Sequence, residues 1–343
     1  MNLQEFFGIE LPVIQAPMAG VQGSALAIAV SNAGGLGSLP CAMMTPQVLR
    51  AELAALAAQT RRPYNVNFFC HTPPAPDAAR EAKWRAALAP YYAELGIAPP
   101  SATGGGRAPF SHEFADLIAE FKPAVVSFHF GLPSADLLQR VKSWGAKVLS
   151  SATTLAEARW LEANGADAII AQGLEAGGHR GLFLTDDLST QLGTLALLPQ
   201  VVRAVRVPVI AAGGIADAAG VKAALALGAA GVQVGTSYLL CPEATTTALH
   251  RAALKSDRAE HTALTNLITG RPARGMYNRL MRELGPLSNA PPAFPLATAA
   301  LAPLKAAAEA LGRDDFSTLW SGQNASGCRE LPAAELTRRL GAG

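Results

Sequence analysis

Short apolar runs rich in β-branched residues recur along the chain, and each is followed by an alanine-rich stretch long enough for a helix. This alternation is typical of a parallel sheet whose strands are joined by helices. We predict eight strands, at residues 11–17, 34–39, 64–69, 124–130, 147–152, 167–173, 207–213 and 231–235. Eight such strands predict an α/β fold, a closed (β/α)8 barrel of the TIM type.

The composition is that of a compact enzyme with a large core. Half of the 343 residues are hydrophobic and 16% are charged. The net charge of +2 gives no excess of basic residues for binding nucleic acid. Every stretch of about 18 residues contains glycine, proline or polar residues, so none is continuously apolar enough to span a membrane. Acidic residues stand near the N-terminus, where a signal peptide needs positive charge. We therefore expect a cytoplasmic protein with no nucleic-acid or membrane partner.

The four cysteines, Cys41, Cys70, Cys241 and Cys328, are far apart in the sequence. None of them has a second cysteine or a histidine at the spacing of a zinc site. We therefore predict reduced thiols and no metal site.

Two regions depart from the repeating pattern. Residues from about 73 to 120 are rich in proline and glycine around a helical patch at 80–95, and predict an insertion after the third strand. Such an insertion lies at the carboxyl ends of the strands, where barrels carry their active sites. Residues 240–343 predict a mainly helical lid or substrate region, so the barrel spans residues 1–239. Whether the end of the chain packs back on the barrel stays open.

Glycines follow the last two predicted strands. Gly213, Gly214 and Ile215 follow the seventh strand, and Gly235 and Thr236 follow the eighth. Barrels often bind phosphate in these two loops, because glycine lets backbone N–H groups approach the ligand closely. The alternative is that the glycines only form tight turns. Their presence after consecutive strands favours a phosphate site.

The cofactor that fits this site best is a flavin mononucleotide. The closest approach to a dinucleotide fingerprint, Gly35-Leu-Gly37-Ser-Leu-Pro40, lacks the last glycine, and no Gly-Lys-Ser/Thr occurs. A permanently bound NAD is therefore disfavoured. FMN needs one phosphate site and an apolar slot for its ring, and both are available in a barrel.

Eight segments together resemble the nitronate monooxygenases, formerly called 2-nitropropane dioxygenases. They are VIQAPMAG, YNVNFFCHTPP, VVSFHFGLP, AQGLEAGGHRGLF, PVIAAGGI, GVQVGTSYL, GRPARG and LWSGQ, and they run in the family's order from Gln15 to Gln323. The AAGGI segment is shared with other phosphate-binding barrels, whereas the Glu-Ala-Gly-Gly-His-Arg-Gly run is much more specific. The resemblance is to the bacterial class that acts on alkyl nitronates.

The resemblance implies a set of cofactor-binding positions. Ala16, Pro17 and Met18 would line one side of the flavin ring, and Asn67, or Asn65 on the same face, would contact it. Further contacts to FMN would come from Gln172, Gly177, Gly178, Gly213, Gly214, Gln233, Val234, Gly235 and Thr236. His179 matches the histidine that the family uses beside the substrate.

His179 is also a reasonable catalytic residue on physical grounds. A neutral imidazole can take a proton from an activated carbon acid and can then donate to an anionic nitro group. A lone histidine is more often a solvated loop residue, but we place His179 at the carboxyl end of the sixth strand, which favours catalysis.

For several other polar residues the sequence is compatible with two roles. Glu175 either orients its loop or is solvated, and Ser127 and His129 point either towards the flavin or into the packed barrel. Roles near the substrate for His71, Lys305 and the arginines from Arg271 to Arg282 also stay open, although the arginines suit a solvated helix face with salt bridges.

We expect an enzyme that uses FMN and O2 to convert an alkyl nitronate to a carbonyl compound and nitrite. The resemblance implies that the nitronate reduces the flavin and O2 reoxidises it, so that NADH is not needed. Two alternatives are an NAD(P)H:quinone reductase on the same FMN barrel and a phosphate- or flavin-binding barrel without catalysis. The physiological nitronate, the use of neutral nitroalkanes and the oligomeric state stay open.

Overall fold

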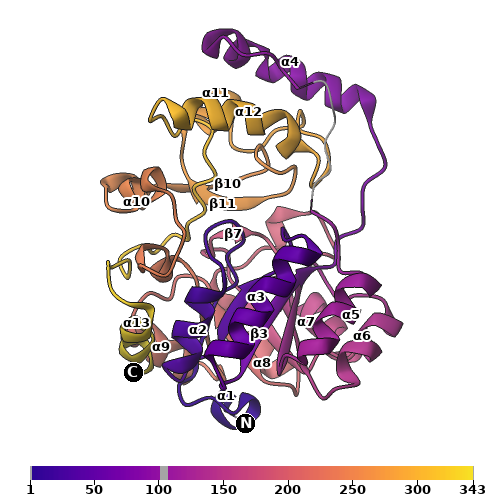
Figure 1. Ribbon diagram of the computed structural model, residues 1–343, viewed down its shortest axis with the longest axis vertical. Coiled ribbons are helices and arrows are strands. Elements are labelled where there is room, and N and C mark those ends of the chain that lie inside the picture. The colour runs from indigo at the N-terminus through magenta and orange to yellow at the C-terminus, as the bar shows by residue number, and fades with distance from the viewer. Residues whose placement is uncertain (1, 101–106, 343) are drawn as a thin grey trace.

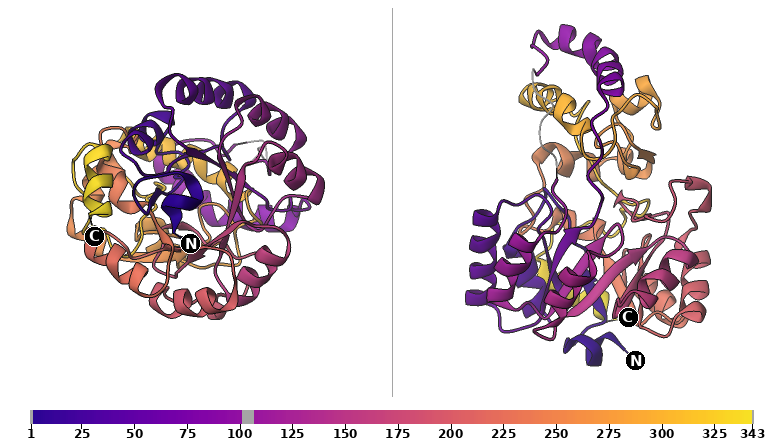
Figure 2. Two further views of the ribbon diagram at one scale, coloured as in Figure 1. Left: turned by 90° about the horizontal axis from the view of Figure 1, so that it is seen from below. Right: turned by 90° about the vertical axis from the view of Figure 1, so that its right-hand side faces the viewer.

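The computed structural model describes residues 2–100 and 107–342. Eight parallel strands form one sheet: β1 (Val13–Gln15), β2 (Gly37–Pro40), β3 (Tyr64–Phe69), β4 (Val125–His129), β5 (Lys147–Ala152), β6 (Ala168–Gln172), β8 (Val209–Ala212) and β9 (Gly231–Val234). Their order is β1-β9-β8-β6-β5-β4-β3-β2, and a parallel bridge between Ile14 and Leu36 joins the two ends. The predicted (β/α)8 barrel is confirmed, and Figure 2 shows its ring of helices in the left-hand view.

The outer ring is built from the helices that follow the strands. These are α2 (Ser24–Asn32), α3 (Pro46–Gln59), α5 (His112–Phe121), α6 (Ala135–Lys142), α7 (Leu155–Ala163), α8 (Thr194–Ala204) and α9 (Ala218–Ala226). The eighth place is taken by the last helix, α13 (Ala333–Gly341), which packs between α2 and α9. The end of the chain therefore packs back on the barrel and completes its helical layer.

The interior of the barrel changes from apolar to polar along its axis. Short helix α1 (Leu3–Phe7) covers one end, and its Leu3 and Phe7 pack with Ile14, Leu36 and other aliphatic residues of the strands. Ser127 and Ser151 lie on the inward face two residues further along β4 and β5 than Val125 and Leu149, and they line a cavity. This polarity points to the carboxyl ends of the strands as the functional end.

A second layer, which we call the cap, stands above those strand ends (Figure 1). It consists of α4 (Ala78–Leu95), β10 (Thr262–Thr265), β11 (Ala273–Met276), α11 (Arg279–Leu284) and α12 (Ala297–Ala310). Strands β10 and β11 pair in antiparallel fashion, and β11 also pairs with β7 (Gly178–His179) from the barrel. Helix α10 (Ala248–Leu254) and the short 3-10 helices η1 (Leu188–Thr190), η2 (Thr236–Leu240) and η3 (Asp257–Glu260) lie in the connections.

Helix α4 is fixed to the rest of the cap although its neighbours lie about 200 residues later in the sequence. The Trp84 indole N–H donates to the Ala297 carbonyl at 3.1 Å, and the Tyr92 hydroxyl donates to the Ala300 carbonyl at 2.6 Å. Glu94 accepts hydrogen bonds from Arg279 and Arg313, which lower its pKa to about 2. Helix α4 of the insertion therefore stabilises the position of α12.

The structure differs from the sequence expectations in two places. The C-terminal region contains strands β10 and β11 as well as helices, and both were missed because four-residue strands carry little periodicity. The segment that leaves the barrel after β3 is also shorter than expected, because α5 packs beside α3 and α6 in the outer ring. None of the helices within residues 2–100 and 107–342 has the length and apolar character needed to span a membrane.

Closure of the barrel depends on a close contact between β2 and α2. A Cβ atom at Gly37 would lie 2.0 Å from the Ala27 carbonyl oxygen of α2. We expect Gly37→Ala to destabilise the protein by about 2 kcal/mol or more, because the backbone of α2 must move. Urea denaturation followed by circular dichroism measures this loss.

Gly220→Ala on α9 is the matched control. Its added Cβ would lie 3.3 Å from Ile215 Cγ2 and 3.6 Å from Asp217 Oδ1 and Ile215 Cα, which are far looser contacts than the one at Gly37. Replacing a helical glycine by alanine should change stability by about 1 kcal/mol or less, in the stabilising direction. Equal destabilisation by the two substitutions would contradict this account of barrel closure.

Candidate active site

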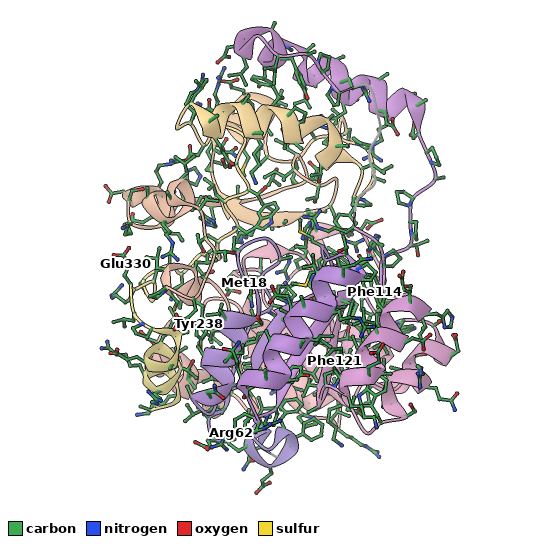
Figure 3. All side chains as sticks on the ribbon, viewed as in Figure 1. Met18, Arg62, Phe114, Phe121, Tyr238 and Glu330 are labelled. Carbon is green, nitrogen blue, oxygen red and sulfur yellow. The ribbon has the colours of Figure 1, made fainter. Side chains whose placement is uncertain are left out.

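One cavity of about 370 Å³ lies between the carboxyl ends of the barrel strands and the cap. Figure 3 shows Met18 at the level where the two layers meet. Every residue predicted from the sequence for cofactor or substrate lines this cavity: Ala16, Pro17, Met18, Asn67, Gln172, Gly177, Gly178, His179, Gly213, Gly214, Gln233, Val234, Gly235 and Thr236. The predicted positions are therefore brought together in one place.

A cradle for an anion is formed by the loops after β8 and β9. Gly213 and Gly214 have φ angles of 117° and 73°, which only glycine adopts readily. In the described part of the chain, the N–H groups of Gly214, Ile215 and Thr236 donate to no backbone or side-chain acceptor. Such free N–H groups at a glycine turn suit a phosphate.

The wall beside the cradle carries a further unsatisfied atom. Gln233 Oε1 is buried and has no hydrogen-bond partner within the described residues, so it is available to a ligand. Asn67 lines the cavity and donates to the Ser127 hydroxyl at 2.9 Å. Asn65 lies deeper, fully buried, and donates to Ser38 and Ser127. Of the two asparagines, Asn67 is placed to meet a ligand.

The loop from β6 to β7 is held rigidly despite its glycines. The Gln172 side chain donates to the His179 carbonyl at 2.9 Å and accepts from the Gly181 N–H at 2.8 Å. The fully buried Arg180 guanidinium donates to the Gln172 and Gly173 carbonyls. These bonds tie the two ends of the loop together.

Glu175 has the orienting role rather than the solvated one. Its carboxylate accepts from the Thr194 N–H at 2.8 Å and from the Thr194 hydroxyl at 2.8 Å, at the beginning of α8. A carboxylate at a helix N-terminus is electrostatically favoured. Glu175 therefore anchors the glycine loop to α8.

His179 lies seven residues beyond the end of β6, on the short strand β7, where it pairs with Ala273 of the cap. Its Nε2 atom is 2.9 Å from the Thr269 hydroxyl oxygen. The side chain is half-buried in the cavity wall, and desolvation by the surrounding protein lowers its pKa well below the ordinary value, with additional lowering from Arg107, His129, Arg271 and His71. His179 is therefore neutral at pH 7.

Two arginines beside His179, Arg107 and Arg271, form no salt bridge with a carboxylate among the described residues. The Arg271 guanidinium lies 4.1 Å from the centre of the Phe130 ring, and that of Arg107 lies 5.8 Å from the centre of the Phe294 ring. The Nε atoms of both are buried and have no partner among the described residues. The site is consequently electropositive and suits an anion.

The His129 side chain extends from β4 to β7, the strand that carries His179. Its Nδ1 is 3.0 Å from the Ser151 hydroxyl and its Nε2 is 3.2 Å from the His179 carbonyl oxygen. Because a carbonyl only accepts, Nε2 carries the proton and Nδ1 accepts from Ser151. Burial lowers the pKa of His129 to about 3, so this arrangement holds at neutral pH.

Some of the remaining candidates from the sequence line the cavity and others do not. Ser127, His129 and Lys305 line the cavity, whereas His71 is buried behind it, 4.8 Å from the Phe294 ring. The arginine group does not form one solvated helix face. Arg271 lies in a loop, Arg274 is buried on β11 and donates to the Leu174 carbonyl, and only Arg279 and Arg282 belong to α11.

Several lining residues were not singled out from the sequence. Arg107 lies in the proline- and glycine-rich insertion, His250 lies on the short helix α10, and Thr269, which contacts His179 without lining the cavity, lies in an irregular segment where no periodicity marks it. Trp320, whose ring centre is 5.7 Å from that of His179, belongs to the LWSGQ segment. Among these residues, Trp320 alone lay in a segment that the sequence had already linked to the family. Within the described residues, no group of three or more His, Cys, Asp or Glu side chains is placed to hold a metal ion.

The desolvated histidines make stability depend on pH. His129, His179 and His250 have lowered pKa values in the folded protein, with His250 at about 4, against about 6.5 when unfolded. The unfolded chain therefore binds more protons below pH 6.5, and the free energy of unfolding should fall as the pH falls from 6.5 to 5.

His129→Gln removes one of these groups. We expect the slope of the free energy of unfolding against pH, measured by urea denaturation, to decrease by up to about 1.4 kcal/mol per pH unit, one proton. An unchanged slope would show that His129 is protonated in the folded protein.

The chain is similar to characterised families over its whole length. A family model described as nitronate monooxygenase matches residues 1–343. A nitronate monooxygenase of Pseudomonas aeruginosa is 46% identical over 336 residues, 97% of this chain and 96% of that protein. One from Paraburkholderia phytofirmans is 47% identical over 342 residues, 98% and 93% of the two chains.

Solved structures agree with these relatives. The nitroalkane oxidase of Streptomyces ansochromogenes has a TM-score of 0.90 and 39% identity, covering 99% of this chain and 96% of its own. FabK of Thermotoga maritima has a TM-score of 0.71 and 27% identity, covering 99% and 94%. With the family's motifs gathered around one cavity, the chain belongs to the nitronate monooxygenase family and is an oxidoreductase.

Proposed function

We propose that the protein is an FMN-dependent enzyme that oxidises alkyl nitronates with O2 to a carbonyl compound and nitrite. The observation that carries this proposal is a neutral, half-buried His179 flanked by two arginines, in the same cavity as a glycine cradle for a phosphate. Membership of the family supplies the reaction class, and the cavity supplies the places for cofactor and substrate.

The cavity fits FMN on its own chemistry. The free N–H groups of Gly214, Ile215 and Thr236 suit the phosphate, and the unsatisfied Gln233 Oε1 suits a hydroxyl of the ribityl chain. Met18 and Asn67 would border the ring. When bound there, FMN would supply the electron-transfer chemistry that links oxidation of the nitronate to reduction of O2.

The protein's part begins with binding of the anionic nitronate. Arg107 and Arg271 provide positive charge beside His179, and neither is within hydrogen-bond distance of a carboxylate among the described residues. An anion that enters this enclosed site exchanges its hydration for fixed positive charge. We propose that this exchange selects the nitronate over neutral molecules.

His179 has a defined tautomer in this proposal. The Thr269 hydroxyl lies 2.9 Å from His179 Nε2 and 3.3 Å from the Arg271 carbonyl oxygen, which can only accept. The hydroxyl hydrogen then points to the carbonyl, and Thr269 accepts from the Nε2–H of His179. Nδ1 is left as the basic atom of the ring.

The lowered pKa of His179 bears on which form of the substrate is used. A ring that resists protonation is a weak base, so it is poorly suited to removing a proton from a neutral nitroalkane. A preformed nitronate needs no such step. This favours alkyl nitronates as substrates, with the charge of the anion balanced by Arg107 and Arg271 and its position limited by the His179 ring.

The cap shields the reaction from water. Ile268 and Leu301 from the cap and the adjoining Trp320 line the cavity opposite the barrel strands. Exclusion of water strengthens the attraction between the arginines and the anion and protects reactive species. A rigid cap, held by α4, is therefore part of the proposed mechanism.

We expect His179→Asn to lower kcat/KM for the nitronate of 2-nitropropane by about ten-fold, because the imidazole lies beside the proposed place of the nitronate and its loss disturbs how the anion is positioned. Oxygen consumption and nitrite release measure the rate, and the absorbance of bound flavin checks that the cofactor is retained. His112→Asn, at a side chain that is 77% exposed, is the matched control and should leave both unchanged.

Anaerobic rapid mixing separates the alternatives. The proposal requires a nitronate to bleach the flavin faster than NADH or NADPH does. Rapid bleaching by NADH with none by nitronates would establish a quinone reductase instead. Purified protein without flavin absorbance would contradict both flavin enzymes.

A further inference from the structure

The cavity extends past His179 to a second polar end between α10 and α12. Thr247, His250, Lys305, Glu309 and Ser317 line this end. We call it the distal compartment. Trp320 separates it from the catalytic end, because its ring faces His179 and its backbone carbonyl acts on the His250 imidazole.

His250 has an unused hydrogen-bonding atom in this compartment. The residue is only 2% exposed, and its Nε2 is buried without a partner among the described residues. The Trp320 backbone carbonyl beside the ring favours the tautomer with the proton on Nδ1, because a carbonyl only accepts. Nε2 consequently presents a lone pair and needs a donor.

A buried acceptor without a donor is costly, about 1–3 kcal/mol. Protonation does not relieve it at neutral pH, because burial lowers the pKa of His250 to about 4, and the nearby charges of Lys305 and Arg251 act in the same direction. A ligand that brings an O–H or N–H group to Nε2 removes this cost.

Lys305 offers the complementary donor. Its Nζ lies 3.9 Å from Glu309 Oε1, at the limit of an ion pair, and Glu309 Oε1 also accepts from the Ser317 hydroxyl at 2.5 Å. The ammonium group therefore has N–H donors to spare. Leu239, Leu301 and Ala302 provide apolar surface in the same wall.

We propose that the distal compartment binds a hydroxyl group of the substrate, so that the enzyme prefers nitronates whose carbon chain carries a hydroxyl at its far end. The hydroxyl donates to His250 Nε2 and accepts from Lys305 Nζ. This inference rests on the proposed function, because it names the substrate class of the same cavity.

Other end groups match the compartment less well. A carboxylate satisfies Lys305 but brings only lone pairs to Nε2, and a methyl group satisfies neither residue. An ammonium group would satisfy Nε2 but would be repelled by Lys305. A hydroxyl alone provides one donor and acceptor lone pairs on one atom.

Pairs of nitronates that differ only in this group provide the test. The nitronates of 3-nitropropan-1-ol and 1-nitrobutane are one pair, and those of 5-nitropentan-1-ol and 1-nitrohexane are a longer one. For at least one chain length we expect the holoenzyme to favour the alcohol in kcat/KM by about five-fold, the range of one neutral hydrogen bond. The preference should appear in KM, since the group is remote from the reacting carbon.

Variants of His250 and Lys305 separate a specific contact from general polarity. His250→Phe and Lys305→Met should reduce the alcohol-to-alkane ratio to about one or below, because an apolar site favours the alkane. His250→Gln retains an acceptor and should restore part of the preference. Rates with the alkane nitronate show whether each variant is folded and active.

Binding gives a readout that does not need turnover. Anaerobic titration of each pair, followed by the absorbance of the bound flavin, should give the same preference in Kd. Equal affinity for both members at every length, or a preference unchanged in His250→Phe, would overturn the inference. If no nitronate supports O2 consumption but the alcohols still bind more tightly in a His250-dependent way, the proposed function fails and the distal compartment stands.

Discussion

The pairing of β7 with β11 is the interaction on which the rest of the site depends. Two residues of a barrel loop, Gly178 and His179, form a strand with Arg274 and Ala273 of the cap. The Arg180 N–H continues this ladder to the Pro272 carbonyl at 2.9 Å. One short ladder thus fixes the position of the imidazole and joins the two layers. A movement of the cap relative to the barrel would move His179 with it.

The electrostatics of the site follow from what surrounds this joint. His129 and Gln172 both donate to the His179 carbonyl, so the backbone at His179 is held from two sides. Arg180 is fully buried, and burial lowers its pKa to about 10 although Glu175 and Glu157 oppose this. Its donors go to loop carbonyls and to Gln191, which are neutral. Positive charge is therefore left over around the cavity, which suits the anionic substrate that we propose.

The sequence predicts the barrel well because short apolar runs alternate regularly with stretches of helical length. Residues 64–69 and 147–152 are strands at the predicted bounds, and the glycines of the predicted phosphate site were singled out because they follow two such strands, β8 and β9. The cap was predicted poorly. Strand β11, Ala-Arg-Gly-Met, has no alternation, and its place depends on pairing with a loop almost 100 residues earlier. Arg107 and Thr269 reach His179 through this tertiary arrangement, which local periodicity does not encode.

Helix α12 shows how the insertion after β3 affects the substrate site without lying in it. Ala297, Ala300, Leu304 and Ala308 are buried, and α12 packs against α4. Thr298, Ala302, Lys305 and Glu309 recur at the spacing of one helical face and line the cavity. The α4 contacts from Trp84 and Tyr92 reach the first turns of this helix. Because one face of α12 is fixed by α4, the other can vary in sequence without loss of the fold. Under the proposed function, changes along this face of α12 would alter substrate preference and leave His179 and the glycine loops of the barrel in place.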